Sequence, residues 1–81
     1  MEDVVEYVRR SKYRQEILKS IAKDAKIPSQ ISRDTGILQN HISFILNQLK
    51  KEDLIVCINP EVKKGRVYRL TDYGEDIIKK I

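Results

Sequence analysis

The sequence predicts an α+β fold, in which a core of three helices carries a two-stranded β-hairpin and ends in a further helix. Two observations give this prediction. Apolar residues recur at helical spacing over most of residues 11–51. After them, residues 54–70 contain two short apolar and β-branched runs on either side of a polar turn. At 81 residues the chain has room for one domain, which we expect to span residues 1–81.

The stretch Ile27–Leu49 is predicted to form two short helices separated by Gly36. Pro28 suits the first turn of the first helix, because an N–H at that position would have no partner within the helix. Glycine permits the left-handed φ that a tight turn between helices requires. The second helix, expected at about residues 39–51, buries a face composed of Leu38, Ile42, Ile45, Leu46 and Leu49. Together these elements predict a helix-turn-helix.

Both of these helices lack an ordinary N-cap. Ile27 and Leu38 stand where Ser, Thr, Asp or Asn usually accepts a hydrogen bond from the first turn. Gln30 and Gln39 are the side chains that can reach back to a free backbone N–H instead. The helix starts are therefore less sharply specified than is usual.

Two predicted strands and a basic turn follow the second helix. Leu54–Asn59 is rich in β-branched and apolar residues and is bounded by Pro60. Arg66–Leu70 alternates charged with apolar side chains, which is the pattern of a half-buried strand. The turn between them, Glu61–Gly65, ends in two lysines and a glycine. These segments predict a hairpin with a basic tip, which we call the wing, at about residues 60–69.

Three further apolar sets complete the expected core. Ser11 is a suitable N-cap for a helix whose buried face is expected to contain Tyr13, Ile17, Leu18, Ile21 and Ala22. Thr71 can cap a final helix that has on one side Tyr73, Ile77, Ile78 and Ile81. A third set at the N-terminus suits a short extra helix and consists of Val4, Val5, Tyr7 and Val8.

In this order the elements resemble those of the winged helix-turn-helix transcriptional regulators, in particular small archaeal ones near the MarR and ArsR groups. The likeness covers almost all of the chain beyond its first ten residues. It is carried by Ser11-Lys12-Tyr13-Arg14, Ile17-Leu18, Ile31-Ser32, Gly36-Ile37, Ile42-Ser43, Leu54-Ile55-Val56-Cys57, Lys64-Gly65-Arg66-Val67-Tyr68-Arg69-Leu70-Thr71 and Gly74. The resemblance implies a regulator of transcription that binds double-stranded DNA at specific sequences. One departure is Phe44, which stands where relatives often carry a basic residue.

On this interpretation the second helix enters the major groove, and the wing contacts the DNA backbone or the minor groove. The net charge of +4 suits a polyanionic partner, although each basic residue can also be an ordinary solvated surface position. The residues expected to read bases are Gln39, Asn40, Ser43, Phe44 and Asn47. The residues expected at the DNA backbone are Arg14, Ser29, His41, Lys51, Lys63, Lys64 and Arg66.

The apolar residues near the two termini leave two arrangements open. In the first they form the interface of a homodimer, whose two-fold symmetry would match two-fold DNA half-sites. In the second they close over the domain's own core. We favour the dimer, because one small domain has difficulty in burying every apolar set at once. The residues expected at this interface are Val4, Val5, Val8, Ile77, Ile78 and Ile81.

Other kinds of site find little support in the sequence. His41 and Cys57 are the only histidine and cysteine, so one chain cannot assemble a metal cluster from them. Cys57 lies inside an apolar strand, where we expect a buried and unreactive thiol. The chain has neither a nucleophile elbow nor catalytically spaced carboxylates. We therefore expect no enzymatic activity, no cofactor or metal, and no small-molecule effector.

The chain also lacks the features of an exported or membrane protein. No apolar run approaches the roughly 20 residues that cross a membrane, and the acidic N-terminus is unlike a signal peptide. A single cysteine suits a reducing compartment, so we expect a cytoplasmic protein.

One alternative function remains, a winged-helix protein-interaction module of the basal transcription machinery, because a fold does not fix its function. Phe44 favours this alternative. The basic wing, together with the Asn and Gln residues of the second helix, favours DNA.

Overall fold

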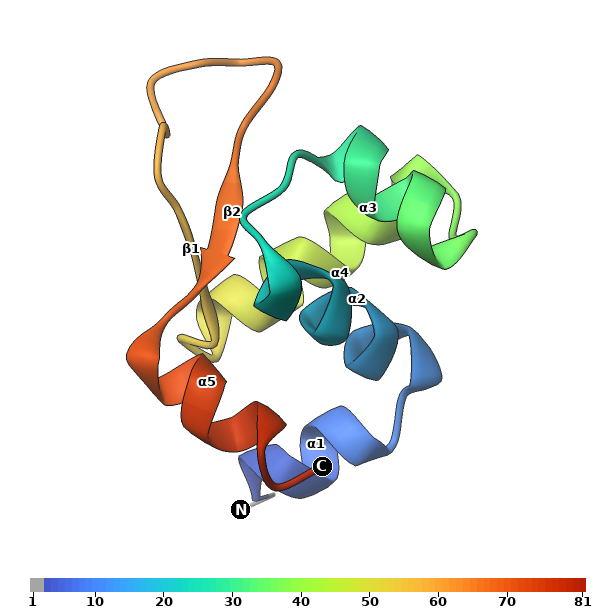
Figure 1. Cartoon of the computed structure of the whole chain (residues 1–81), viewed down its shortest axis with the longest axis vertical. Helices are drawn as coiled ribbons and strands as arrows, with labels where there is room; N and C mark the ends of the chain where they lie inside the picture. Colours follow the sequence, from blue (N-terminus) through green and yellow to red (C-terminus); the bar gives the residue numbers. More distant parts are fainter. Residues whose placement is uncertain (1–2) are drawn as a thin grey trace.

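The computed structural model describes residues 3–81, and it has the α+β winged architecture that the sequence predicts (Figure 1). Three helices form the centre, and a hairpin and a final helix follow them. A further short helix precedes them at the N-terminus. In chain order the elements are α1 (Val4–Arg9), α2 (Lys12–Lys23), α3 (Pro28–Thr35), α4 (Gln39–Lys51), β1 (Ile55–Cys57), β2 (Tyr68–Leu70) and α5 (Asp72–Ile78).

The helix starts follow the predicted capping residues. Ser11 Oγ accepts a hydrogen bond from Arg14 N at 3.2 Å, and Thr71 Oγ1 accepts one from Gly74 N at 2.9 Å. At the start of α3, Gln30 Oε1 accepts from Ile27 N at 3.0 Å, so Gln30 supplies the polar contact that Ile27 cannot. Leu38 precedes α4 without a side-chain cap.

Gly36 makes the turn of the helix-turn-helix. Its φ is +76°, in the left-handed region, and a Cβ at this position would meet no neighbouring atom. The backbone angle is therefore what favours glycine here, not close packing. Ser32 and Thr35 brace the turn, because Ser32 Oγ donates to Ile37 O at 2.6 Å and Thr35 Oγ1 accepts from Ile37 N at 3.2 Å.

One apolar core joins α1, α2, α3, α4, both strands and α5. Most of the predicted core positions are buried or half-buried, but four residues that we expected inside are exposed: Tyr13, Ala22, Leu38 and Tyr73. Tyr13, Ala22 and Tyr73 lie at the margins of the apolar faces of their helices, and Leu38 lies just before α4. Helical spacing groups such residues with the core, but it does not say how far the neighbouring elements extend over each face.

The hairpin that carries the wing contains a two-stranded antiparallel sheet, in which Ile55 pairs with Leu70 and Cys57 with Tyr68. Both strands are shorter than the predicted Leu54–Asn59 and Arg66–Leu70. Beyond the ladder, Asn59 replaces backbone pairing with side-chain bonds. Its Oδ1 accepts from Val67 N at 2.7 Å, and its Nδ2 donates to Gly65 O at 3.1 Å. A polar side chain thus holds the two arms of the wing together where the strands end.

Helix α1 lies close to α5 and to the C-terminal residue, at the opposite end of the molecule from the wing (Figure 1). Val8 and Ile77 are buried within the monomer, and they therefore cannot lie on a dimer surface as the sequence suggested. The other four predicted interface residues are half-buried and pack against the same core: Val4, Val5, Ile78 and Ile81. Arg9 Nη2 donates to Lys80 O at 2.9 Å and ties the two ends together. The terminal apolar residues thus close in part over the domain's own core.

Candidate nucleic-acid interface

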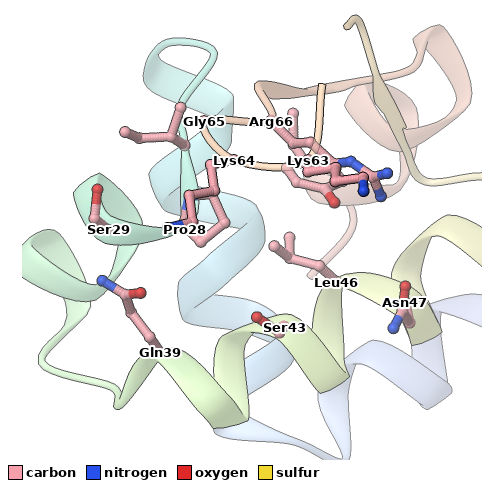
Figure 2. A pocket seen from close by; sticks show the side chains of 12 residues that line it. Pro28, Ser29, Gln39, Ser43, Leu46, Asn47, Lys63, Lys64, Gly65 and Arg66 are labelled. Carbon is pink, nitrogen blue, oxygen red and sulfur yellow. The ribbon is translucent and has the colours of Figure 1, made fainter. Parts of the chain in front are cut away.

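An open groove, which we call the α4–wing groove, runs between α3, α4 and the wing (Figure 2). Polar and basic side chains form most of its border, and apolar side chains form part of its floor. Its lining residues are Ile27, Pro28, Ser29, Gln39, Ser43, Leu46, Asn47, Lys63, Lys64, Gly65, Arg66 and Tyr68.

The polar side of the groove comes from one face of α4. Gln39, Ser43 and Asn47 follow one another at intervals of four residues, so they lie along the same side of the helix. All three are exposed, and in Figure 2 they project from α4 into the groove. The opposite face of the helix is buried in the core, which fixes the orientation of this polar row. Leu46 is buried and reaches the floor of the groove.

The basic side of the groove comes from the wing. Lys63, Lys64 and Arg66 are exposed there, around Gly65, whose φ is +74°. Arg66 Nε donates to Val62 O at 2.7 Å, so this side chain also braces the tip of the wing. The predicted wing lysines and arginine therefore face the same opening as the polar row of α4.

The first turn of α3 forms the remaining border. Ser29, which the sequence predicted at the DNA backbone, lines the groove here. Ile27, Pro28 and Tyr68 line it as well, and sequence reasoning did not include them among the site residues. The helix-starting signal at Pro28 marks this end of α3, but only the fold shows that the end faces the wing.

The other predicted residues of α4 lie outside the groove lining. Asn40, Phe44 and Lys51 are exposed on the neighbouring face of the helix, and Phe44 keeps 63% of its surface accessible. His41 lies on the side nearest α2, where its ring meets that of Tyr13 edge-on at 6.1 Å. The predicted set is thus divided between the groove, the outer face of α4 and its α2 side.

Arg14 is not brought together with the other predicted backbone contacts. It is half-buried, its guanidinium lies 3.8 Å from the centre of the Tyr7 ring, and its Nη1 donates to Tyr7 O at 2.8 Å. These contacts join α2 to α1. The structure therefore shows Arg14 in a packing role between two helices, because a basic residue that is close in sequence to other basic residues can still be used for internal packing. A contact between Arg14 and DNA stays a prediction.

Metal or thiol chemistry has little basis among residues 3–81. No group of three or more His, Cys, Asp or Glu side chains able to hold a metal ion occurs in this part of the chain. Cys57 is buried on the wing strand, and its Sγ lies 3.6 Å from Asn59 Oδ1. None of the helices within these residues is long and apolar enough to cross a membrane.

A helix-turn-helix whose second helix and following basic hairpin border one groove defines a winged-helix domain. A sequence profile of the winged helix-turn-helix family matches residues 9–81, and the chain belongs to this family. A search of curated protein sequences gives no match.

Solved structures give the same fold. The transcriptional repressor CouR, solved bound to a 23-mer DNA duplex, superimposes with a TM-score of 0.78 at 20% identity, over 94% of this chain and 55% of that one. A MarR-family transcription regulator gives a TM-score of 0.77 at 25% identity, over 94% and 56%. The plasmid segregation protein TubR gives 0.79 at 13% identity, over 98% and 84%. This chain thus spans about 55% of the length of the first of these regulators.

Proposed function

We propose that the chain is a transcriptional regulator that binds double-stranded DNA at specific sequences, and that residues 1–81 act as one DNA-binding domain. The observation that carries this proposal is the α4–wing groove, where the polar row of α4 and the basic tip of the wing face one opening. An α-helix with its side chains is about 10–12 Å wide, which matches the roughly 12 Å major groove of B-DNA. Membership of the winged helix-turn-helix family supports the proposal.

In this proposal α4 enters the major groove and reads bases. Asn40, Phe44 and Asn47 stand on or beside the outermost face of the helix, opposite its buried face, and all three are exposed. Asn can pair with adenine through two hydrogen bonds, and an apolar side chain can contact the methyl group of thymine. Sites that contain A·T pairs are therefore the expected targets. Gln39 and Ser43 lie on the groove side of the same helix and extend the reading surface toward the wing.

The wing and the helix ends position the domain on the DNA backbone. Lys63, Lys64 and Arg66 provide positive charge on one side of the inserted helix. Ser29, at the start of α3, provides a hydroxyl group on the other side. His41 and Lys51 are exposed at the flank and end of α4 and complete the proposed contacts.

We also propose that the protein works as a homodimer. Four half-buried apolar residues lie at one end of the molecule: Val4, Val5, Ile78 and Ile81. The hydrogen bond from Arg9 to Lys80 O joins α1 to the C-terminal residues there. This end lies away from the wing, so association there leaves the α4–wing groove free (Figure 1). A two-fold dimer would present two copies of α4 to two half-sites.

A gel-shift titration with random duplex DNA over a salt series tests the DNA-binding proposal. We expect binding that weakens steeply with salt, because each phosphate contact releases counterions. Selection from random duplexes should then enrich a common sequence. A protein that binds no duplex even at low salt would contradict the proposal.

A second function, as a protein-interaction module, is favoured by one specific observation. Leu38 and Phe44 are 65% and 63% exposed at the N-terminal half of α4, and Tyr13 beside His41 is 44% exposed. Exposed apolar side chains in one region can mark a protein contact. If this reading is correct, Phe44→Ser will abolish a protein interaction and leave duplex binding unchanged.

A further inference from the structure

The backbone of Lys26 connects α3 to the wing. Lys26 lies in the short connector between α2 and α3, and it pairs with Tyr68 in both directions. Lys26 N donates to Tyr68 O at 3.0 Å, and Tyr68 N donates to Lys26 O at 2.9 Å. The connector thus occupies the edge of β2 that β1 leaves free. Ile27 and Pro28, the next residues along the chain, line the α4–wing groove together with Tyr68.

The side chain of Lys26 extends to α2 and α3. Its Nζ donates to Ser20 O at 2.8 Å and to Ser20 Oγ at 3.2 Å, and it forms an ion pair with Asp34 Oδ2. Ser20 Oγ in turn donates to Asp34 Oδ2 at 3.0 Å. An ammonium group has three N–H donors, and all three therefore have an acceptor. The Lys26 side chain is only 14% exposed, and Ser20 is the buried polar residue of α2.

This network is charged at neutral pH. Hydrogen bonds from Lys26 and Ser20 hold the pKa of Asp34 below its ordinary value, and the nearby charges of Lys26 and Lys23 act in the same direction. Hydrogen bonds in which both partners are ionised are roughly twice as strong as neutral ones. Asp34 belongs to the last turn of α3, so the network fixes that end of α3 to α2, while Lys26 itself leads into the first turn.

We infer that Lys26 is a positioning residue of the α4–wing groove, because it sets the spacing between α3 on one side and the wing on the other. One residue makes both connections: its backbone holds the base of the wing, and its ammonium group holds α2 and α3. Lysine suits this role because a flexible stem delivers three donors to a single point. The claim that this spacing affects DNA recognition rests on the proposed function. The claim that Lys26 sets the spacing between α3 and the wing is independent of that function.

The substitution Lys26→Met isolates the ammonium group, because it keeps an unbranched apolar stem and leaves the backbone pairing with Tyr68 possible. Lys23→Met is the matched control. Lys23 lies in the last turn of α2 beside the same network, and its substitution by Met removes one positive charge, as Lys26→Met does. Asp34→Asn removes the carboxylate charge, and Ser20→Ala removes the hydroxyl while the Ser20 carbonyl stays as an acceptor. These two variants carry the test if Lys26→Met fails to fold, as judged by circular dichroism.

The spacing can be measured directly with spin labels. Labels at Ser29→Cys and Lys64→Cys, in a Cys57→Ala background, report the distance across the groove by electron–electron double resonance. We expect Lys26→Met to broaden the distance distribution, with Asp34→Asn and Ser20→Ala showing a smaller broadening and Lys23→Met none. Equal distributions in the Lys26→Met and Lys23→Met proteins would overturn the inference.

DNA binding by the unlabelled proteins gives the second measurement. Relative to Lys23→Met, Lys26→Met should lose about tenfold of its preference for a selected duplex over random duplex, as expected when a charged hydrogen-bond network is removed. A broadened distance distribution with unchanged preference would overturn the role in recognition. If the wild-type protein binds no duplex at all, the proposed function fails, and the distance measurement still decides the role of Lys26 in the fold.

Discussion

At the scale of single residues, the outer face of α4 is where sequence recognition should be concentrated. Asn40 and Asn47 are exposed there, on a helix whose other side is fixed in the core. Gln48 is a half-buried polar residue of the same helix, and it belongs neither to the proposed base-reading residues nor to the proposed backbone contacts. Comparing substitutions of Asn40 and Asn47 with one of Gln48 therefore distinguishes a loss of base recognition from the general effect of replacing a polar residue on α4.

Asn40→Ala and Asn47→Ala should each weaken binding to the preferred site by about 1–3 kcal/mol and flatten discrimination between sites. The reason is that a bidentate contact to adenine is lost while the phosphate contacts remain. Selection from random duplex DNA measures both effects, with Gln48→Ala as the control. If both Asn variants kept the wild-type site preference, this face of α4 would not be the reading surface.

Asp34 gives a prediction about pH. Because Lys26 and Ser20 lower the pKa of Asp34 in the folded protein, its ionised form stabilises the fold. This contribution is complete above the unfolded-state pKa of about 3.9 and is lost as the pH falls through the folded-state pKa. Asp34→Asn should therefore destabilise the protein near neutral pH, and the difference from wild type should shrink in acid.

Urea denaturation of the two proteins at several pH values measures this difference directly. Comparison of the variant with wild type cancels the titration of all other groups. A difference in the free energy of unfolding that stays constant from neutral pH to about pH 3 would show that the carboxylate charge does not stabilise the fold.

At the scale of elements, the sequence predicted which elements form more accurately than how far each extends. The glycine turn at Gly36 and the caps at Ser11 and Thr71 follow from local chemistry, and the structure confirms them. The strand lengths do not follow from local chemistry. Asn59 closes the wing through its side chain, and an Asn at the end of an apolar run reads equally well as the last residue of a strand.

The candidate site shows the same limit. The sequence indicated the polar face of α4 and the basic wing, because both appear as continuous patterns. It could not show that Arg14 is used against Tyr7, since that contact depends on how α1 packs. It also could not show that Lys26 pairs with Tyr68, because the two residues are far apart in the chain.

The wing as an element should contribute binding energy that does not depend on sequence. Lys64→Ala and Arg66→Ala should weaken binding to all duplexes alike and lower the slope of log affinity against log salt by about one each. Binding titrations over a salt series test this. Because Arg66 also bonds Val62 O, Lys64→Ala is the cleaner of the two variants. A loss confined to one DNA sequence would instead mean that the wing reads bases in the minor groove.

At the scale of the whole molecule, the surface formed by α1, α5 and the last residues determines whether the protein can act as a dimer. Val8 and Ile77 are used inside the monomer, so the available apolar surface is smaller than the sequence suggested. Four half-buried residues remain, Val4, Val5, Ile78 and Ile81. Complete burial of such side chains contributes roughly 1.5–3 kcal/mol each, so the proposed dimer is a modest one.

Sedimentation equilibrium at micromolar concentration should show a species of twice the monomer mass of 9.5 kDa. Ile78→Glu should shift it to the monomer, because it places a charge in the proposed interface. Circular dichroism of the variant checks that the fold is retained, since Ile78 also packs against the core. A single 9.5 kDa species that Ile78→Glu leaves unchanged would eliminate the dimer.

The central claim is that α4 and the wing contact one DNA duplex together. Amide chemical-shift mapping by NMR, during titration with a selected duplex, tests it most directly. We predict the largest shifts in the first half of α4, at Asn47, at residues 63–66 of the wing and at Ser29, with smaller changes in α1 and α5. Shifts confined to α1 and α5, or an unchanged spectrum at saturating DNA, would contradict the claim.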